Sequence, residues 1–336
     1  MKAGLVPVLL LILVSSSLNA QELEGPPLDS LVGVRWDPKT DTFEKMNKYS
    51  YTYDNKDRQT SSKNENWYQG ELSICSRNIY TYDSTDKMVS KEYQKLKDGD
   101  WIGEELETYT YDPMGRLLIR LSDKDSKQTY TYNKQGKQSS EMDQAWEDDK
   151  WKNILYTTWA YDLNGKMIKE VKKGIYDEQN LFTYDAKGIL IKKTYLKWNG
   201  KDWNNNSCND YTYDLQGNII KDSYSNWAGG KWQNTEQTTY TYDGKKNMLS
   251  QLQQEKKDGS GWANISRLTF AYDANNHVTS TLREDWKNGS WVNYKKELFT
   301  YDKEETLLYY SEIMWLQDSW KKTDEHKYKA YYHIRK

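Results

Sequence analysis

Pairs of tryptophan are the residues of this sequence whose type and spacing could most directly bind a ligand. The two members of each pair stand five positions apart, at Trp146/Trp151, Trp198/Trp203, Trp227/Trp232, Trp286/Trp291 and Trp315/Trp320. An indole ring offers a large flat apolar face with a polar N–H at its edge, which is the chemistry that stacks on a sugar ring. We therefore predict that these tryptophans bind a ligand, with the alternative that they only form the protein core.

Aspartates recur as regularly and could hold calcium. Each follows a tyrosine, at Asp54, Asp83, Asp112, Asp162, Asp185, Asp214, Asp243, Asp273 and Asp302. An aspartate that opens a turn is already explained by hydrogen bonds to its own backbone, and Asn133 takes the same place once. We therefore expect no metal site and no cofactor.

The three histidines, His277, His326 and His333, form no recognisable catalytic pattern with other residues. Neither a serine–histidine–aspartate set, a cysteine–histidine pair nor a zinc-protease motif is present. A pair of glycosidase carboxylates is the alternative, but nothing marks one pair as unique among so many acidic residues. The sequence therefore predicts a protein that is not an enzyme.

These residues are positioned by one repeated phrase, aromatic-x-Tyr-Asp. Its first residue falls at Tyr51, Tyr80, Tyr109, Tyr130, Trp159, Phe182, Tyr211, Tyr240, Phe270 and Phe299. Most copies begin 29 residues after the previous one, whereas the units that begin at Tyr109 and Trp159 have only 21 and 23 residues. A fixed period in this range indicates a repeat architecture, in which each unit packs against its neighbours.

One unit consists of two predicted strands and two predicted turns. Tyr-x-Tyr alternates as a strand does, and the Asp-x-x-Gly that follows it has the composition of a tight turn. The second turn is clearest at Asn288-Gly289, which would set Lys287 opposite Ser290 and Trp286 opposite Trp291. The two short units lack a tryptophan pair, so we expect them to form shorter hairpins.

Alternation along a strand predicts which side chains share a face. From Trp232, every second residue is Asn234, Glu236, Thr238, Tyr240 and Tyr242. We therefore expect one face of the sheet to carry a tryptophan row, an asparagine row and a tyrosine row.

The repeats predict an all-β protein, an antiparallel β-hairpin repeat array coiled into a spiral or a curved sheet. A flat sheet of roughly 20 strands would be unusual, because strands twist. The alternative is a β-propeller, but the repeat shows no two-unit alternation of the kind that four-stranded blades need. Residues 32–336 would form a single domain of about ten units, closed by a strand from Tyr328 to Ile334.

The start of the chain has the features of an export signal. Residues 1–20 contain Lys2, an apolar stretch from Leu5 to Val14 and small residues before Gln21, and residues 21–31 are interpreted as a linker. The apolar stretch is too short to span a membrane, and no later one is long enough. We predict a secreted or cell-envelope-associated protein (in the periplasm, on the outer surface or extracellular) with no membrane span.

Composition narrows the range of partners. The net charge of −2, from 48 basic and 50 acidic residues, argues against nucleic acid. Cys75 and Cys208 lie several repeats apart, so we expect no disulfide. The apolar area is carried by rings, since the chain has 15 Trp and 29 Tyr.

The phrase Tyr-Thr-Tyr-Asp-Pro-Met-Gly at residues 109–115, followed by Tyr-Thr-Tyr-Asn at residues 130–133, resembles the YD (RHS-type) repeat. In that family each short unit is a β-hairpin, and many units coil into a sheet that can enclose a cargo. Most units here are longer and carry the added tryptophan hairpin, a form similar to repeats in exported proteins of Bacteroidetes-type bacteria. The resemblance implies a hairpin-repeat fold and a structural or encapsulating role.

Together these observations predict an exported, non-enzymatic repeat protein that binds an extended ligand by stacking on tryptophans of successive units. A polysaccharide is the first expected partner and a surface protein or peptide the second. The alternative is a structural or encapsulating scaffold. Exposed tryptophan rings would favour binding, whereas rings sealed in a core would favour a scaffold.

Overall fold

The computed structural model describes residues 28–37, 42–68, 70–174, 177–257, 261–301, 307–316, 318–321 and 327–334. The predicted export signal, residues 1–20, lies outside these residues, as does most of the predicted linker. Every regular element within the described ranges is a β-strand. None of the described residues forms a helix that could cross a membrane.

The described residues form 23 strands. In order they are β1 (Leu28–Asp37), β2 (Thr42–Tyr53), β3 (Gln59–Tyr68), β4 (Glu71–Tyr82), β5 (Met88–Lys97), β6 (Asp100–Tyr111), β7 (Leu117–Ser122), β8 (Ser126–Tyr132), β9 (Gln138–Glu147), β10 (Lys150–Tyr161), β11 (Met167–Gly174), β12 (Glu178–Tyr184), β13 (Leu190–Trp198), β14 (Trp203–Tyr213), β15 (Ile219–Ala228), β16 (Lys231–Tyr242), β17 (Met248–Lys257), β18 (Gly261–Tyr272), β19 (Val278–Lys287), β20 (Ser290–Tyr301), β21 (Leu307–Leu316), β22 (Ser319–Lys321) and β23 (Lys327–Ile334).

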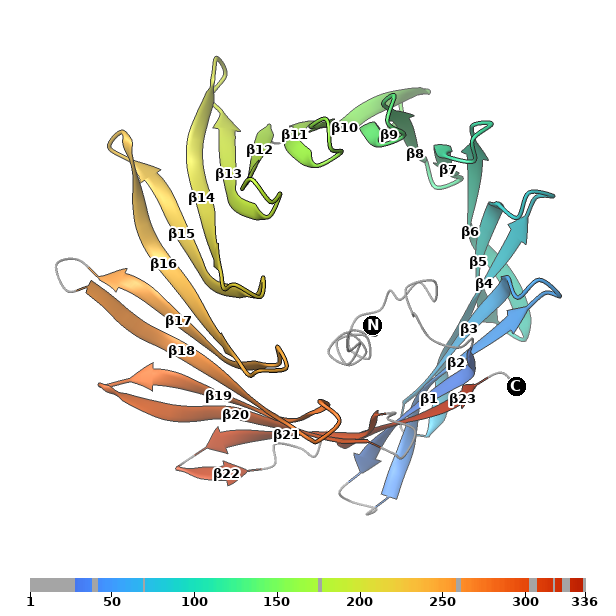
Figure 1. The fold of residues 1–336 in the computed structure, drawn as a ribbon. Coiled ribbons are helices and arrows are strands. Elements are labelled where there is room, and N and C mark those ends of the chain that lie inside the picture. The colour runs from blue at the N-terminus through green and yellow to red at the C-terminus, as the bar shows by residue number, and fades with distance from the viewer. Residues whose placement is uncertain are drawn as a thin grey trace.

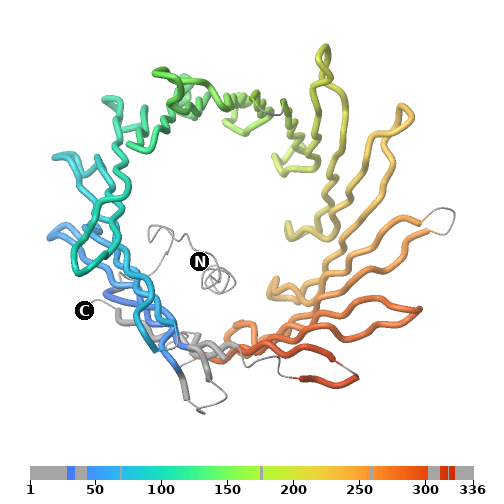
Figure 2. The backbone as a smooth tube through the Cα atoms, turned by 180° about the vertical axis from the view of Figure 1, so that it is seen from behind, coloured from blue at the N-terminus to red at the C-terminus, as the bar shows by residue number. Residues whose placement is uncertain are grey.

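All strands belong to one sheet, which curves into a ring (Figure 1, Figure 2). From β1 to β22 each strand pairs antiparallel with the next strand along the chain. β23, which covers the final strand predicted from Tyr328 to Ile334, pairs with both β21 and β1, so the last strand lies beside the first. The predicted curved hairpin array is confirmed. The propeller alternative is wrong, because the strands form one continuous sheet and not separate blades.

The aspartate of the repeated phrase caps the turn that follows it. Asp214 Oδ1 accepts hydrogen bonds from the backbone N–H groups of Gln216 and Asn218, both at 2.9 Å. The same pair of bonds is made by Asn133 and by Asp54, Asp83, Asp112, Asp162, Asp185, Asp243 and Asp273. Turn formation therefore explains this row of aspartates; Asp302 lies outside the described residues.

The second aromatic residue of the phrase ties each repeat to the one before it. The Tyr242 hydroxyl donates to the backbone carbonyl of Ile219 at 2.9 Å, and the Tyr213 hydroxyl donates to that of Leu190 at 2.7 Å. Each acceptor is the first residue of the strand that follows the preceding turn. The same bond is made by Tyr82, Tyr111, Tyr132, Tyr161, Tyr184, Tyr272 and Tyr301.

Burial keeps the tyrosine rows in their neutral form. Burial first, and then nearby acidic or tyrosine side chains, raise the pKa of Tyr51, Tyr130, Tyr211 and Tyr301 to about 12. A neutral phenol keeps its O–H, so it remains a hydrogen-bond donor well above neutral pH.

Each long hairpin contains a β-bulge, which changes the arrangement of faces from the one that the sequence predicted. In the hairpin β15–β16, Tyr224 pairs with Glu236 and Ser225 pairs with Asn234, so Thr235 is an extra residue. Equivalent extra residues are Ser73, Glu104, Ile154, Asn206, Ile265 and Tyr294. One extra residue moves every side chain beyond it to the opposite face.

The prediction that tryptophans and tyrosines share a face is therefore wrong. The tryptophan pairs lie on one face of the sheet, here called the tryptophan face. The tyrosines of the repeated phrase lie on the other, here called the tyrosine face. Little of either face is sealed: within the described residues the buried apolar side chains are Val34, Cys75 and Cys208. The two cysteines are free thiols, as predicted.

Candidate functional site: the tryptophan hairpins

The predicted tryptophan pairs meet across their hairpins. Trp286 pairs with Trp291 and Lys287 with Ser290 around Asn288-Gly289, whose positive φ angles of 51° and 82° fit a tight hairpin turn. Ring centroids lie 5.2 Å apart in Trp146/Trp151, 5.4 Å in Trp198/Trp203, 4.9 Å in Trp227/Trp232, and 5.0 Å in both Trp286/Trp291 and Trp315/Trp320. The interplanar angles, from 59° to 77°, are close to the edge-to-face geometry that aromatic pairs prefer.

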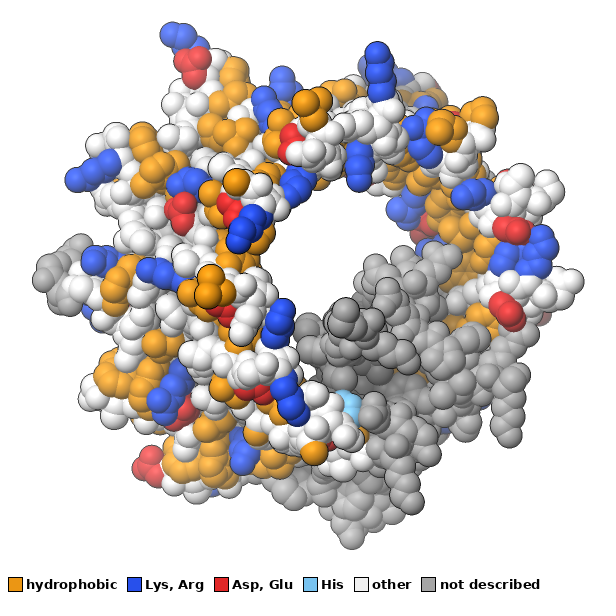
Figure 3. Space-filling model, in the orientation of Figure 1, with side chains coloured by type: hydrophobic (Ala, Val, Ile, Leu, Met, Phe, Trp, Pro, Cys, Tyr) orange, Lys and Arg blue, Asp and Glu red, His pale blue; other side chains and the backbone are white. Residues whose placement is uncertain are grey.

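The paired rings are half-buried, which places them between a sealed core and a free surface. Trp146 and Trp198 keep 40% and 41% of their surface exposed, and Trp227 and Trp320 keep 36%. Figure 3 shows hydrophobic side chains along the outer flank of the ring, over the hairpins of β13 to β20. In the pairs of β9–β10, β13–β14 and β15–β16, the tryptophan before the turn is the more exposed one.

A cation from a neighbouring unit covers the second ring of several pairs. The Arg267 guanidinium lies 4.6 Å from the centroid of Trp291, and the ammonium of Lys192 lies 5.4 Å from that of Trp232. Arg267 is held in place by Glu284, whose Oε1 accepts from Arg267 Nη2 at 2.8 Å. A cation–π contact of this kind contributes ~0.5–1 kcal/mol at exposed sites. In these two pairs the second tryptophan therefore has a structural role, whereas Trp227, the first tryptophan of the Trp227/Trp232 pair, remains exposed.

The two short units interrupt the series of tryptophan hairpins, as predicted. β7 and β8 have 6 and 7 residues, and β11 and β12 have 8 and 7. Each short hairpin supports the tryptophan pair that follows it. The backbone N–H of Trp146 donates to the backbone carbonyl of Asp125 at 2.8 Å, and the backbone N–H of Trp198 donates to that of Asp177 at 3.4 Å.

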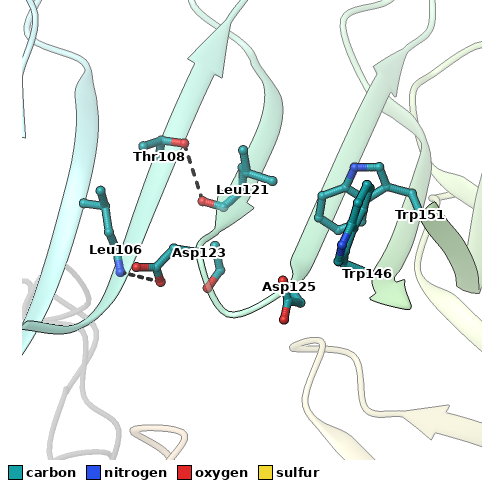
Figure 4. A pocket seen from close by; sticks show the side chains of 8 residues that line it. Leu106, Thr108, Leu121, Asp123, Asp125, Trp146 and Trp151 are labelled. Atoms are coloured by element: carbon teal, nitrogen blue, oxygen red, sulfur yellow. Dashed lines mark hydrogen bonds between the residues drawn. The ribbon is translucent and has the colours of Figure 1, made fainter. Parts of the chain in front are cut away.

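A pocket opens where the short hairpin β7–β8 leaves one flank of Trp146/Trp151 uncovered (Figure 4). Its volume is about 420 Å³, and its lining consists of Leu106, Thr108, Leu121, Ser122, Asp123, Asp125, Trp146 and Trp151. Leu106 N–H donates to Asp123 Oδ1 at 2.9 Å, which fixes one carboxylate at the rim. Sequence analysis did not predict this pocket, because no motif marks it. The indication in the sequence is that the short unit lacks the tryptophan hairpin that would cover this flank.

The structure also places the acidic and histidine residues that were considered as candidate sites. Within the described residues, no group of three or more His, Cys, Asp or Glu side chains is placed to hold a metal ion. His277 lies beside a capped turn, with Nδ1 3.2 Å from Asp273 Oδ2, and its ring stacks on Tyr301 at 4.7 Å between centroids. The side chains of His326 and His333 lie outside the described set.

Comparison with known proteins gives no family. No protein-family model and no curated protein matches the chain. Among solved structures, the chain is similar to part of a Tc holotoxin pore of Photorhabdus luminescens, with 11% identity and a TM-score of 0.39 over 89% of this chain and 18% of that one. A protein of unknown function from Bacteroides fragilis gives 15% identity and a TM-score of 0.31 over 37% of this chain and 93% of that one.

A porin-like protein from Bacteroides uniformis gives 10% identity and a TM-score of 0.27 over 80% of this chain and 95% of that one. The chain thus spans less than a fifth of the length of the Tc holotoxin chain. All three TM-scores lie below 0.5, so these similarities carry no argument about what this chain does. Its function has to be inferred from its own residues.

Proposed function

We propose that this chain is a non-enzymatic binding module that holds an extended polysaccharide on its tryptophan face. The observation that carries the proposal is the exposure of Trp146, Trp198 and Trp227, of which 40%, 41% and 36% of the surface stays open. A structural tryptophan would gain more by full burial, because apolar area removed from water stabilises the fold. The exposed rings instead contact their partner rings edge-on or tilted, at interplanar angles of 68°, 59° and 69°.

The spacing of the hairpins fits a polymer better than a small ligand. Neighbouring long hairpins lie two strands apart, which is about 10 Å at ordinary strand spacing. The tryptophan pairs of β13–β14 and β15–β16, and those of β19–β20 and β21–β22, are neighbours of this kind, at an interval comparable with a disaccharide of an extended glycan. The other successive pairs lie four strands apart. Several weak stacking contacts to one chain add up, because each later contact is intramolecular.

The second candidate is a structural or encapsulating scaffold of the YD-repeat type. The cations over Trp232 and Trp291 favour it, since they show that some indole faces are already used within the protein. Export to the cell envelope or medium belongs to both proposals, and a surface protein or peptide is the alternative ligand for the same tryptophans.

Titration of the purified protein with soluble polysaccharides, followed by intrinsic tryptophan fluorescence, tests the proposal. We expect a saturable shift with at least one polymer. Trp198→Ala with Trp227→Ala, which removes two exposed rings of neighbouring tips, should weaken that binding about tenfold, as the loss of ~1.4 kcal/mol would. Trp198→Ala, at a single exposed ring, is a milder variant, and circular dichroism should show that both fold.

Leu215→Ala is the matched control, because Leu215 is a fully exposed apolar side chain of a capped turn, away from the tryptophan hairpins. It should bind like the wild type. Absence of any shift with every polysaccharide, or equal affinity of all the variants, would leave the scaffold as the better account.

A further inference from the structure

We propose that the pocket between the short hairpin β7–β8 and Trp146/Trp151 is a subsite for one uncharged hexose residue, and that Asp123 and Asp125 make it reject acidic sugars. This inference rests on the proposed function, because it names the class of polysaccharide. It goes beyond that function by assigning two carboxylates that belong to no tryptophan pair.

The apolar part of the pocket has the shape that one sugar ring needs. Trp146 and Trp151 form one wall, and Leu106 and Leu121 line the pocket opposite them (Figure 4). The volume of about 420 Å³ falls in the range of small-ligand sites. The C–H face of a hexose could stack on the exposed ring of Trp146, while the rim stays open for the rest of the polymer.

The polar part consists of two carboxylates with spare acceptor capacity. Asp123 accepts from the Leu106 N–H through Oδ1 only, so Oδ2 has no partner among the described residues. Asp125 is fixed through its backbone carbonyl, which accepts from the backbone N–H of Trp146. Its exposed carboxylate has no hydrogen-bond or ion-pair partner within the described part of the chain.

Ionised carboxylates are acceptors only, and they bind strongly to hydroxyl donors. Sugar hydroxyls supply such donors. A uronate or a sulfated sugar would instead bring a third negative charge close to these two carboxylates, which is unfavourable even at the dielectric of a protein surface. The pocket is therefore suited to neutral glycans.

The other short hairpin provides an internal comparison. β11–β12 lies beside Trp198/Trp203 as β7–β8 lies beside Trp146/Trp151, and the Asp177 carbonyl matches that of Asp125. However, the second short hairpin has a lysine at the position of Asp123. Lys173 pairs with Tyr156 there, as Asp123 bonds to Leu106 in the first. The pair of carboxylates is therefore specific to the first short hairpin, because at the two equivalent positions the second has only Asp177, whose Oδ1 accepts from the Gly174 backbone N–H at 3.1 Å.

The test compares the intact protein with Asp123→Asn plus Asp125→Asn. Asparagine keeps the side-chain oxygen that accepts from Leu106, and it tolerates the positive φ of 64° at Asp125. The control is Asp148→Asn plus Asp149→Asn, which removes the same charge from the adjacent tip, where φ is 53° and 59° and where Asp148 makes an exposed ion pair with Lys152. Probes are hexasaccharides of β-1,4-glucan, α-1,4-glucan, β-1,4-mannan and β-1,4-xylan, with a galacturonate hexamer as the acidic probe. Binding is measured by calorimetry.

We expect the wild type to bind at least one neutral hexasaccharide and to bind the galacturonate hexamer at least tenfold more weakly. The Asp123/Asp125 variant should bind the neutral probe about tenfold more weakly and should lose the discrimination against galacturonate. The Asp148/Asp149 control should match the wild type.

Two failures are distinguishable. If the wild type binds a neutral probe but the Asp123/Asp125 variant binds it equally well, or if the wild type binds galacturonate as tightly, the pocket proposal is overturned and the proposed function stands. If the wild type binds none of the probes, the proposed function itself is overturned, and the pocket proposal with it.

Discussion

At the scale of single residues, the turn aspartate shows how much one side chain can organise locally. Its carboxylate accepts two backbone N–H bonds in turn after turn, and Asn133 does the same with an amide oxygen. This role could be predicted from the sequence, because an Asx turn depends only on residues within a few positions. The role of Asp123 could not, because its partner Leu106 lies on another strand, 17 residues away.

Acid sensitivity of the turns is a prediction at this scale. Hydrogen bonds from the Asn218 side chain, and then from backbone N–H groups, hold the pKa of Asp214 below its ordinary value of 3.8. A carboxyl whose pKa is lower when folded adds stability above its unfolded pKa, and that contribution is lost as pH falls through the folded pKa. Asp214→Asn should therefore lose less stability than the wild type between neutral pH and about pH 3.

Urea unfolding at the two pH values measures this difference. Asp98→Asn is the control, because no partner for the exposed Asp98 carboxylate is seen among the described residues, and it should lose as much stability as the wild type. An Asp214→Asn protein that is as acid-sensitive as the wild type would show that the turn carboxylate has no such role.

At the scale of elements, the hairpins were predicted well and their faces were not. Strand pairs, the opposed tryptophans and the two short units follow from local sequence, such as the Asn288-Gly289 turn. The β-bulge at Thr235 and its equivalents could not be recognised, because the alternation of residue types continues across it and a bulge is defined by the partner strand. Thus the sequence predicted the pairs but assigned the tryptophans and tyrosines to one face.

The tie between neighbouring repeats gives a prediction at this scale. Tyr242→Phe removes the hydroxyl that donates to the Ile219 carbonyl and keeps the ring in place. It should lower the free energy of unfolding by about 1 kcal/mol, the usual contribution of such a bond. Tyr68→Phe is the control, because Tyr68 is 67% exposed and its hydroxyl has no partner within the described residues.

Urea unfolding of both variants checks this expectation. Equal destabilisation of Tyr242→Phe and Tyr68→Phe, or none in either, would mean that the hydroxyl bond does not hold the repeats together.

At the scale of the whole molecule, the ring results from adding many similar steps. From β1 to β22 each strand pairs with its chain neighbours, whereas β23 pairs with β21 and with β1, so the last strand lies beside the first (Figure 1). Repetition predicts a curved sheet, since a broad flat sheet is disfavoured by strand twist. Whether the ends meet depends on the sum of many small rotations, which no single motif encodes.

The curvature also decides how a long ligand could be held. Successive tryptophan tips on β13–β14, β15–β16 and β19–β20 belong to one continuous surface, so a flexible polymer could contact several of them in turn. A short oligosaccharide could reach only one tip. The account therefore predicts that affinity depends on ligand length.

The most direct test is calorimetry of the intact protein with a length series of whichever polysaccharide it binds, from a disaccharide to the polymer. The account predicts that affinity rises in steps as the ligand becomes long enough to reach a second and a third tryptophan hairpin, with a total gain of 10²-fold or more, on the order expected for linked contacts. Equal affinity for the shortest oligosaccharide and the polymer would contradict it.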